Sequence, residues 1–412
     1  MGQYLNPGSQ RYQMTVDSEI FVDKTEMIWY LNSIINTQQR FVSVSRPRGF
    51  GKSIAADMVC AYYDRKAMDR GLFEKRLLAK CPPLETRAKT IAWDEHIGKY
   101  DVIRIVMTDF INSDVDVIAG LDKLSGCILE ELIKEYPGVD FYEKTDLIQS
   151  MEDIFEETKC RFVIVIDEWD SVFHERKEDK NGQKRYLNFL RDWLKDKAYV
   201  ALAYMTGVLP IKKFGQQSGL NMFTEYSMMF QREMAPYTGF TEDEVKELAF
   251  RYGLDFEKMK AWYDGYVVRG IIPPEKREEC RKGYYNGHKI SSYNPSSVVS
   301  SIKTGIIGNY WNNSESHEAL ADYIGIKKID GLKDAINLLM DGGRLKVDTS
   351  TYQNDMITFT WLDDVLSLLV HLGYLGFDDE KSEVFIPNLE ILDEFKFSTK
   401  GAEWVEVFAA SR

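Results

Sequence analysis

Apolar residues in the first half of the chain gather in four short runs that are almost continuous. These runs are RFVSVS (40–45), YDVIRIVMTDF (100–110), RFVIVID (161–167) and YVALAYMTG (199–207). Continuous apolar runs of this length are typical of strands that are covered on both faces, as in a parallel sheet flanked by helices. The segments between the runs are long enough for crossover helices. The pattern therefore predicts an α/β fold with a parallel sheet.

Other segments have the spacing or the end signals of helices. Apolar residues recur at helical spacing from Met27 to Ile35. Thr241, with acidic residues directly after it, predicts a helix start, and Gly253 predicts its end. The segment HLGYLGFDDEKSEVFIPN (371–388) predicts two short strands around a polar turn. Helices followed by such a hairpin are typical of a winged-helix-like module, and other small α+β domains share this pattern.

Near residue 240 the sequence changes from alternating strand-like and helix-like segments to mostly helix-like segments, and this change predicts the domain organisation. With 412 residues the chain is long enough for two or three domains. We expect an α/β domain over residues 1–239 and a helix-rich, winged-helix-like domain over residues 240–390. Residues 391–412 are expected to be a linker or the start of a truncated C-terminal region.

Composition and charge exclude several classes of protein. The net charge of −13 argues against a generally basic nucleic-acid-binding surface, although it allows a local basic groove. The five cysteines are scattered without a CxxC pair, which favours reduced thiols, and the five histidines lack metal-binding spacing. No apolar stretch approaches the roughly 20 residues of a membrane helix. We therefore predict a cytoplasmic protein without a structural metal or a membrane partner.

The segment SRPRGFGKS (45–53) lies between a predicted strand and a predicted helix, as a phosphate-binding loop does. Gly49 and Gly51 would let the backbone approach phosphates, Lys52 would reach the β- and γ-phosphates, and the Ser53 hydroxyl would bind Mg²⁺. The usual first glycine is replaced by Arg46. The alternative is a surface turn with a solvated lysine. The predicted nucleotide contacts are Arg46, Pro47, Arg48, Gly49, Phe50, Gly51, Lys52, Ser53 and Ile54.

Two acidic residues end the predicted strand of residues 161–167, in RFVIVIDEWD. Open α/β sheets bind ligands at the carboxyl ends of their strands. There Asp167 would hold the Mg²⁺ shell, and Glu168 would act as a base on the attacking water. The alternative is an acidic strand end that faces solvent. Because the loop and this acidic pair occur in one α/β segment in the expected order, each strengthens the nucleotide-binding interpretation of the other.

A third polar position ends the strand of residues 199–207. Thr206 would sense the γ-phosphate or hold the attacking water, although a threonine that merely ends the strand fits equally well. Four arginines are candidates for stabilising phosphate charge, with solvated or paired side chains as the alternative: Arg46, Arg48, Arg191 and Arg232.

These motifs together resemble the AAA-ATPase-like family, prokaryotic predicted P-loop ATPases that frequently carry a C-terminal PD-(D/E)XK nuclease domain. The resemblance runs through nearly the whole chain. Its motifs are FVDKTEMI (21–28), SRPRGFGKS (45–53), VIVIDEWD (163–170), MTGVLPI (205–211), SGLNMF (218–223), GFTEDEV (239–245), WYDGY (262–266), YNPSSV (293–298), HLGYL (371–375) and IPN (386–388).

The resemblance implies a P-loop NTPase sheet and assigns roles to single residues. Arg46 is then a trait of the family's loop, whereas Gly49 stands where many relatives have a second arginine. Lys52 and Ser53 would contact nucleotide and Mg²⁺, Asp167 would be the metal-shell acid and Glu168 the base. No acidic-x-Lys nuclease core is visible beyond Lys400.

Two functions therefore compete. The first is a Mg²⁺-dependent ATPase that couples its nucleotide state to a protein or nucleic-acid partner, and the retained Glu168 favours it. The second is a nucleotide-binding module of a defence or mobile-element system that does not hydrolyse. A nuclease subunit is a third interpretation, weakened by the acidic charge and the missing nuclease motif. ATP is expected over GTP because no Asn/Thr-Lys-x-Asp signature is evident.

Overall fold

Five parallel strands form the largest sheet of the described residues, in the order β4-β5-β6-β1-β7. The strands are β1 (Phe41–Ser45), β4 (Asp101–Val106), β5 (Phe162–Asp167), β6 (Val200–Gly207) and β7 (Thr224–Tyr226). Every residue of β1, β5 and β6 is buried, which explains their nearly continuous apolar sequences. The predicted α/β fold with four buried parallel strands is confirmed. The short strand β7 was not predicted.

The structure is a computed structural model that describes residues 2–67, 69–85, 90–211, 219–270, 288–311, 317–324, 329–349 and 359–400. Ser218, Cys280 and residues 401–412, which entered the predictions above, lie outside these ranges. The chain forms two units. The first unit comprises Met1–Ser45 and Lys52–Tyr226, and the second comprises Arg46–Gly51 and Ser227–Arg412.

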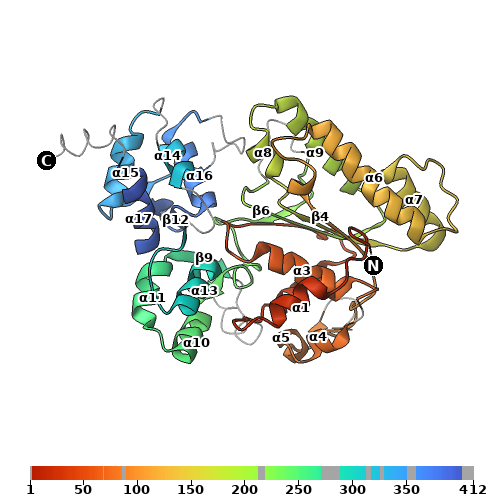
Figure 1. Cartoon of the computed structure of the whole chain (residues 1–412), viewed down its shortest axis with the longest axis horizontal. Helices are drawn as coiled ribbons and strands as arrows, with labels where there is room; N and C mark the ends of the chain where they lie inside the picture. The colour runs from red at the N-terminus through yellow and green to blue at the C-terminus, as the bar shows by residue number, and fades with distance from the viewer. Residues whose placement is uncertain are drawn as a thin grey trace. The chain divides into compact units, whose positions relative to one another are not determined.

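Helices cover both faces of the sheet in the first unit (Figure 1). One face carries α1 (Gln10–Val16) and α3 (Lys52–Tyr63), and the other carries α6 (Val117–Glu135), α7 (Leu147–Thr158), α8 (Ser171–Glu175) and α9 (Lys180–Leu194). Asp116 and Asp146 accept hydrogen bonds from the first N–H groups of α6 and α7, which is why these helices begin there.

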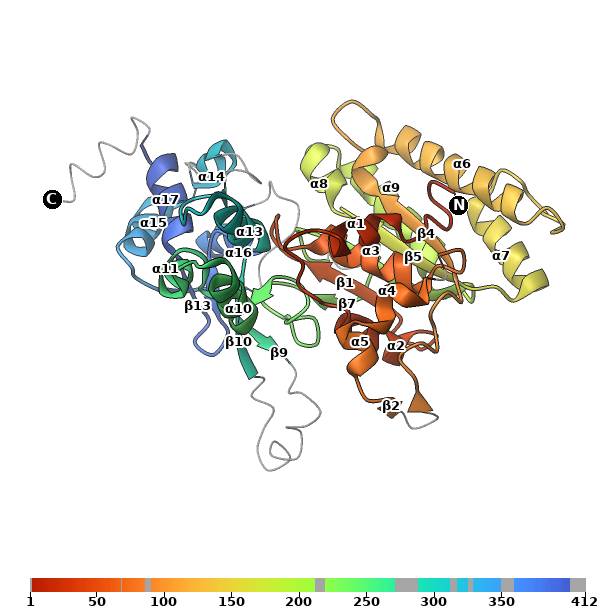
Figure 2. The same ribbon diagram turned by 60° about the horizontal axis from the view of Figure 1, so that its bottom comes forward.

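Smaller elements complete the first unit (Figure 2). The helix predicted over Met27–Ile35 is confirmed as α2 (Glu26–Ile34). The others are α4 (Arg70–Glu74), α5 (Leu77–Lys80), the hairpin of β2 (Leu84–Glu85) and β3 (Thr90–Ile91), and a 3₁₀ turn at Met107–Asp109.

The start of the chain runs along the outer edge of β4. Leu5 forms an antiparallel bridge with Ile103. The N–H of Asn6 donates to the carbonyl of Val102 at 2.7 Å, and the N–H of Arg104 donates to the carbonyl of Tyr4 at 2.9 Å. These bonds satisfy backbone groups of an edge strand that would otherwise be open to another strand.

The second unit holds two small antiparallel sheets among helices. One sheet has the order β8-β10-β9, with strands β8 (Phe240–Thr241), β9 (Tyr266–Gly270) and β10 (His288–Tyr293). The other has the order β11-β13-β12, with strands β11 (Leu345–Lys346), β12 (Gly376–Asp378) and β13 (Glu383–Phe385). The helices are α10 (Glu242–Tyr252), α11 (Phe256–Tyr263), α13 (Pro295–Thr304), α14 (His317–Ile324), α15 (Leu332–Met340), α16 (Leu362–Leu372) and α17 (Leu389–Ser398).

The helix predicted after Thr241 is confirmed as α10. Thr241 and Glu244 form a reciprocal capping box, and Gly253 ends the helix with a left-handed φ of 70°. The predicted hairpin is confirmed as β12 and β13. The prediction was wrong at its first two residues, His371 and Leu372, which belong to α16 because the apolar spacing of that helix continues through them.

A buried glutamate makes the stability of the second unit depend on pH. Glu390 on α17 accepts hydrogen bonds from the Ser297 hydroxyl at 2.9 Å and the Tyr310 N–H at 2.8 Å. Burial raises its pKa to about 7. The folded protein therefore holds a proton that the unfolded chain has lost, and the free energy of unfolding should fall by about 3 kcal/mol as pH rises from about 4.5 to 7.

Urea unfolding at several pH values tests this prediction. The Glu390→Gln variant should lose this part of the pH dependence, whereas Glu257→Gln, at an exposed position of α11, should keep it. Equal pH profiles for the wild type and Glu390→Gln would contradict the prediction.

Candidate nucleotide-binding site

The carboxyl ends of β1, β5 and β6 lie at one edge of the sheet. In the parallel registers, Val44 of β1 pairs with Thr206 of β6, and Ile166 of β5 pairs with Met205. Strand β6 thus separates β1 from β5. Ligands of open α/β sheets bind at this edge, because the chain leaves the strands there and helix N-termini point toward it.

Lys52 begins α3, seven residues after the last residue of β1. Its side chain is buried, with 9% of the residue exposed, so it is not the solvated lysine of the alternative interpretation. Ser53 and Ile54 follow in the first turn of the helix and are exposed. The strand, loop and helix order predicted around the Gly-Lys-Ser tripeptide is therefore present.

The loop residues Arg46–Gly51 belong to the second unit. Gly49 and Gly51 have left-handed φ values of 78° and 82°, which residues with a side chain adopt at a cost. A Cβ atom on Gly49 would lie 2.8 Å from Oδ1 of Asn294. Arg46, Pro47 and Phe50 are buried, whereas Arg48 is exposed. The phosphate contacts assigned to these residues stay predictions.

Asp167 is the last residue of β5 and is 2% exposed. Its Oδ1 accepts hydrogen bonds from the Thr206 hydroxyl and, at 3.1 Å, from the N–H of Glu168. Its Oδ2 lies 3.8 Å from the guanidinium Nη2 of Arg104. The structure therefore brings Asp167 and Thr206 together, as their positions at the ends of neighbouring strands predict.

Glu168 follows Asp167 with a left-handed φ of 54°, a conformation that costs about 1–3 kcal/mol for a residue other than glycine. The residue is exposed, and its Oε2 accepts a hydrogen bond of 2.5 Å from the Thr108 hydroxyl. Such strain is found most often at functional sites. It turns the glutamate out of the strand while Asp167 before it and Trp169 after it stay buried.

A buried arginine at this edge was missed in the sequence. Arg104 on β4 is 6% exposed and pairs with Asp57 of α3 at 2.8 Å, in addition to its contact with Asp167. Burial raises the pKa of Asp57, and the charge of Arg104 opposes that shift. The one basic residue inside the mostly apolar run of residues 100–110 was the available signal. Its partner on another element could not be inferred from that run.

Asp170 was also missed as a member of the site. It is buried and accepts hydrogen bonds from the N–H groups of Val208 and Leu209 at 2.9 and 2.7 Å, and its carboxylate lies 3.0 Å from Nε2 of His174. Burial alone would raise the pKa of Asp170. The hydrogen bond and charge of His174, the Leu209 N–H and the charge of Lys52 together lower it below its usual value. The available signal in the sequence was that Asp170 ends the DEWD motif (167–170), three residues after Asp167.

The arginines proposed to contact phosphate are scattered. Arg191 pairs with the neighbouring Asp192 on α9 at 2.9 Å. Arg232 belongs to the second unit and has a left-handed φ of 41°. Their role at a phosphate stays a prediction.

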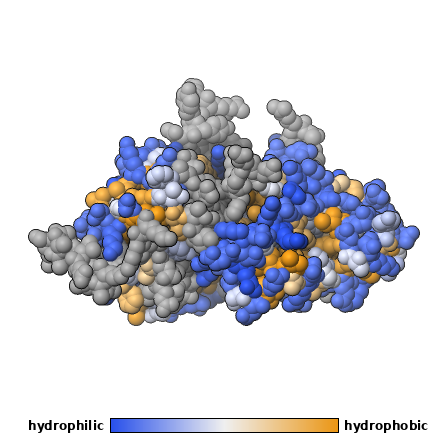
Figure 3. Space-filling view, turned by 90° about the horizontal axis from the view of Figure 1, so that it is seen from above, coloured by the Kyte–Doolittle hydropathy of each residue, from blue (hydrophilic) through white to orange (hydrophobic). Residues whose placement is uncertain are grey.

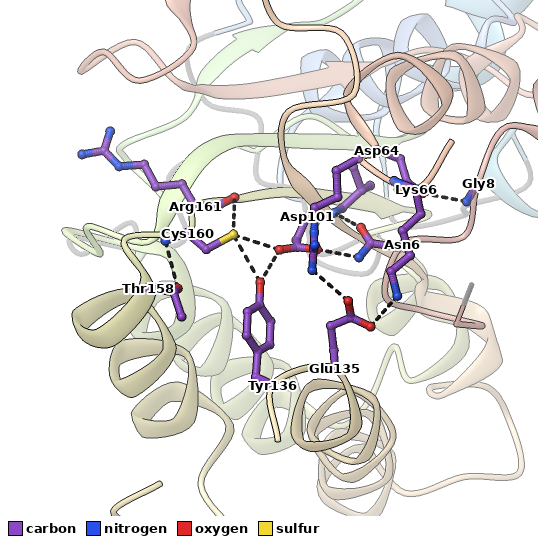
Figure 4. Close-up of polar contacts among 12 residues, drawn as sticks. Asn6, Gly8, Asp64, Lys66, Asp101, Glu135, Tyr136, Thr158, Cys160 and Arg161 are labelled. Atoms are coloured by element: carbon purple, nitrogen blue, oxygen red, sulfur yellow. Dashed lines mark hydrogen bonds and ion pairs between the residues drawn. The ribbon is translucent and has the colours of Figure 1, made fainter. Parts of the chain in front are cut away.

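A second polar cluster lies at the opposite, amino-terminal end of β4 (Figure 4). The carboxylate of Asp101 accepts hydrogen bonds from four side chains: Asn6 at 2.5 Å, Arg65 at 2.5 Å, Cys160 at 2.8 Å and Tyr136. Burial raises the pKa of the Cys160 thiol to about 11, so the thiol stays protonated at neutral pH and is a poor nucleophile. We assign this cluster a structural role.

The Asp101 cluster should make the first unit sensitive to acid. Burial would raise the pKa of Asp101, but its four donors outweigh burial and lower it. The stability that the carboxylate contributes is therefore present above the pKa of the unfolded chain, about 3.9, and is lost as pH falls below it. Asp101→Asn should lower the free energy of unfolding by about 2 kcal/mol at pH 7 and reduce its fall in acid.

Urea unfolding between pH 3 and 7 tests this prediction, with Asp192→Asn on the exposed face of α9 as the control. If Asp101→Asn were as stable as that control at pH 7, the proposed structural role would be wrong.

Within the described ranges, no group of three or more histidine, cysteine, aspartate or glutamate residues is arranged to hold a metal ion. None of the described helices combines the length and the apolar character that crossing a membrane requires. Hydrophilic residues predominate on the face shown in Figure 3, and hydrophobic residues form small patches there.

The parallel sheet flanked by helices, with Lys52 at the start of the helix after β1 and Asp167 at the end of β5, is the α/β fold of the P-loop NTPase class. The chain belongs to the predicted AAA-ATPase family, whose sequence model matches residues 8–216.

Similar proteins include one from Azotobacter chroococcum mcd 1, described as an uncharacterized protein in the vnfD 5′ region. It is 25% identical over 269 residues, which cover 62% of this chain and 46% of that protein. The chain thus matches less than half the length of this relative.

Solved structures with similarity include the ORC2 protein of Aeropyrum pernix, determined as ADPNP–ADP complexes. It is 11% identical, with 98% of this chain and 99% of that chain covered and a TM-score of 0.34. Cdc6p of Pyrobaculum aerophilum is 9% identical, with 91% and 92% covered and a TM-score of 0.31.

Proposed function

We propose that the protein is a Mg²⁺-dependent ATPase that couples its nucleotide state to a protein or nucleic-acid partner. The observation that carries the proposal is the hydrogen-bonded pair of Asp167 and Thr206 at the edge of the sheet where β1 also ends. Lys52 opens the helix that follows β1. A triphosphate at this edge would meet a cation, acidic ligands for its metal and a polar sensor together.

The oxygen atoms of Ser53 and Asp167 fit a hard divalent cation such as Mg²⁺. Oδ1 of Asp167 already accepts two hydrogen bonds, whereas Oδ2 lies 3.8 Å from Arg104, beyond hydrogen-bond distance. Oδ2 is therefore the oxygen that we assign to the metal shell. Bound Mg²⁺ would neutralise charge on the phosphates.

Glu168 is the proposed base for the attacking water. Its exposure leaves the carboxylate accessible to water, and the left-handed backbone directs it away from the buried end of the strand. Thr206 would hold the water or the γ-phosphate. Lys52 and the backbone of Gly49 and Gly51 would bind the phosphates.

An ATPase assay tests the proposed reaction. Phosphate release from ATP should require Mg²⁺, stop with EDTA and exceed release from GTP. The assay is repeated with double-stranded DNA, because DNA stimulation identifies a nucleic-acid partner, whereas an unchanged rate favours a protein partner. The absence of Mg²⁺-dependent phosphate release in a preparation that binds ATP would overturn hydrolysis.

The second candidate function is a nucleotide-binding module that does not hydrolyse. It is favoured by the hydrogen bond that the Thr108 hydroxyl donates to Glu168, because a donor that stabilises the carboxylate makes it a weaker base toward water.

Replacing Thr108 distinguishes the two functions. In an ATPase, Glu168 acts as the base and is restrained by the Thr108 hydroxyl, whereas in a binding module Glu168 never acts as a base. Thr108→Val keeps the shape of the side chain but removes the donor to Glu168. If the proposed ATPase is correct, phosphate release should rise by about 3- to 10-fold, the equivalent of one hydrogen bond. Thr90→Val, on the small hairpin of β2 and β3, is the control. If neither Thr108→Val nor Thr90→Val releases phosphate from ATP, the result would support the binding module.

A further inference from the structure

Four sequence motifs of the second unit have no part in the proposed chemistry. They are GF (239–240), WYDGY (262–266), YNPSS (293–297) and HLGYL (371–375). In the structure, each of them supplies a residue that lies against the loop of residues 46–51, which belongs to the same unit. These contacts link the loop to four separate segments of the second unit.

Two backbone donors hold carbonyl groups of the loop. The N–H of Gly239 donates to the carbonyl of Phe50 at 3.0 Å, and the N–H of Ser296 donates to the carbonyl of Gly49 at 3.3 Å. Ser296 lies in the first turn of α13, where N–H groups have no partner within the helix. The start of α13 thus supplies a donor to the loop, and the same N–H also donates to the capping side chain of Asn294 at 2.9 Å.

Aromatic and proline contacts join the same loop to two further motifs. The ring of Phe50 lies edge-on to Tyr266 with 5.5 Å between ring centroids. The Tyr266 hydroxyl donates to the carbonyl of Gly373 at 2.6 Å, and a Cβ atom on Gly373 would come within 2.6 Å of the Pro47 ring. Phe50, Tyr266, Gly373 and Pro47 therefore form a closed chain of contacts around the loop.

Glycine is required at three positions of this arrangement. Gly49, Gly239 and Gly373 all have left-handed φ values, of 78°, 97° and 87°. A Cβ atom would clash with Asn294 at the first, Ser292 at the second and Pro47 at the third. Their backbone conformation and the close approach of neighbours both exclude a side chain.

Asn294 stands between the loop and α13. It is 1% exposed, and its Oδ1 caps α13 by accepting the N–H of Ser296 at 2.9 Å. Its Nδ2 has no hydrogen-bond acceptor among the described residues and lies 3.2 Å from the place of a Cβ on Gly49. A buried side chain in this position restricts the movement of the loop.

We propose that Gly239, Tyr266, Asn294, Ser296 and Gly373 form a clamp that holds residues 46–51 in one conformation before nucleotide arrives. They are positioning residues, which act through the loop without touching the nucleotide. The inference rests on the proposed function, because it takes the loop as the phosphate-binding element. A loop that is already ordered loses less conformational entropy on binding, so the clamp increases affinity for nucleotide.

Matched capping variants test the clamp. Asn294→Ala removes the cap of α13 together with the side chain against Gly49. Asp255→Ala removes the cap of α11 in the same unit, where the aspartate accepts the N–H of Lys258 at 3.2 Å. Asn294→Ser is a milder variant that keeps a capping oxygen and removes the amide. The readouts are amide hydrogen exchange of residues 46–54 without nucleotide, and the Kd for Mg²⁺ with a fluorescent ATP analogue.

Both Asn294 variants should exchange the loop amides about 10-fold faster and bind the analogue about 10-fold more weakly, whereas Asp255→Ala should change both by less than twofold. If Asn294→Ala does not fold, the Asn294→Ser variant decides. Unchanged exchange of the loop in the Asn294 variants would overturn the clamp. If the wild type binds no analogue, the proposed function fails, and the exchange data alone still decide whether the clamp exists.

Discussion

Replacing Lys52 with alanine should abolish binding of Mg²⁺-ATP at concentrations that saturate the wild type. The side chain is buried at the start of α3, and its charge contributes to lowering the pKa of Asp170. Loss of a buried, charge-assisted contact with phosphate is expected to reduce affinity by at least about 100-fold. Isothermal titration calorimetry measures this loss directly.

Because Lys52 is buried, its removal also leaves an empty space in the interior. It also removes a positive charge that stabilises the buried carboxylate of Asp170. Lys52→Met, which keeps most of the volume, separates lost charge from lost packing and should bind as poorly as Lys52→Ala. Lys66→Ala is the control, since this lysine pairs with Glu135 in the cluster at the other end of β4. Wild-type affinity in a folded Lys52→Met variant would refute the assignment of the phosphate-binding loop.

Replacing Glu168 with glutamine should trap bound ATP. The proposed role of the carboxylate is to accept a proton from water, and an amide of the same shape cannot do so. A positioned general base contributes about 100- to 10,000-fold to a rate, so phosphate release should fall by at least about 100-fold while the Kd for ATP stays within about threefold. Single-turnover phosphate release and a binding titration on the same preparation measure both quantities.

The neighbouring Glu175, exposed at the end of α8, provides the matched control. Glu175→Gln should hydrolyse ATP at the wild-type rate. Equal rates of phosphate release for the wild type and Glu168→Gln would mean that a residue other than Glu168 is the base. If neither protein turned over ATP but both bound it, the non-hydrolysing module would be the correct interpretation.

The sheet was predictable where burial on both faces left a signature in the sequence. Strands β1, β4, β5 and β6 are nearly continuous apolar runs, because almost every residue of these strands is buried. Strand β7 has three residues, TEY, of which two are half-buried, and so it carries no run that a sequence pattern could reveal. The sheet of β8, β9 and β10 brings together distant segments that are too short for periodicity to identify them.

The candidate site was predictable in its order along the chain and less so in its contacts. A lysine after one strand and an acidic pair after another indicate a shared edge, because parallel strands align their carboxyl ends. Two contacts of the site depend on which strands are neighbours in the sheet. One is the hydrogen bond from Thr108 to Glu168, and the other is the position of Arg104 between Asp57 and Asp167. Neighbour order is a property of the folded sheet, and no local pattern in this chain encodes it.

The residues at the start of the chain cover the edge of β4, and this affects where a purification tag can be attached. On the side of β4 that faces away from β5, the described residues place no strand of the sheet, and the backbone there contacts Tyr4, Leu5 and Asn6. Removing these residues, or displacing them with a bulky purification tag, would uncover a row of hydrogen-bonding groups able to recruit a strand from a second molecule. Intermolecular sheet growth of this kind ends in precipitation, so a tag for crystallisation or assay is better placed away from the first eight residues.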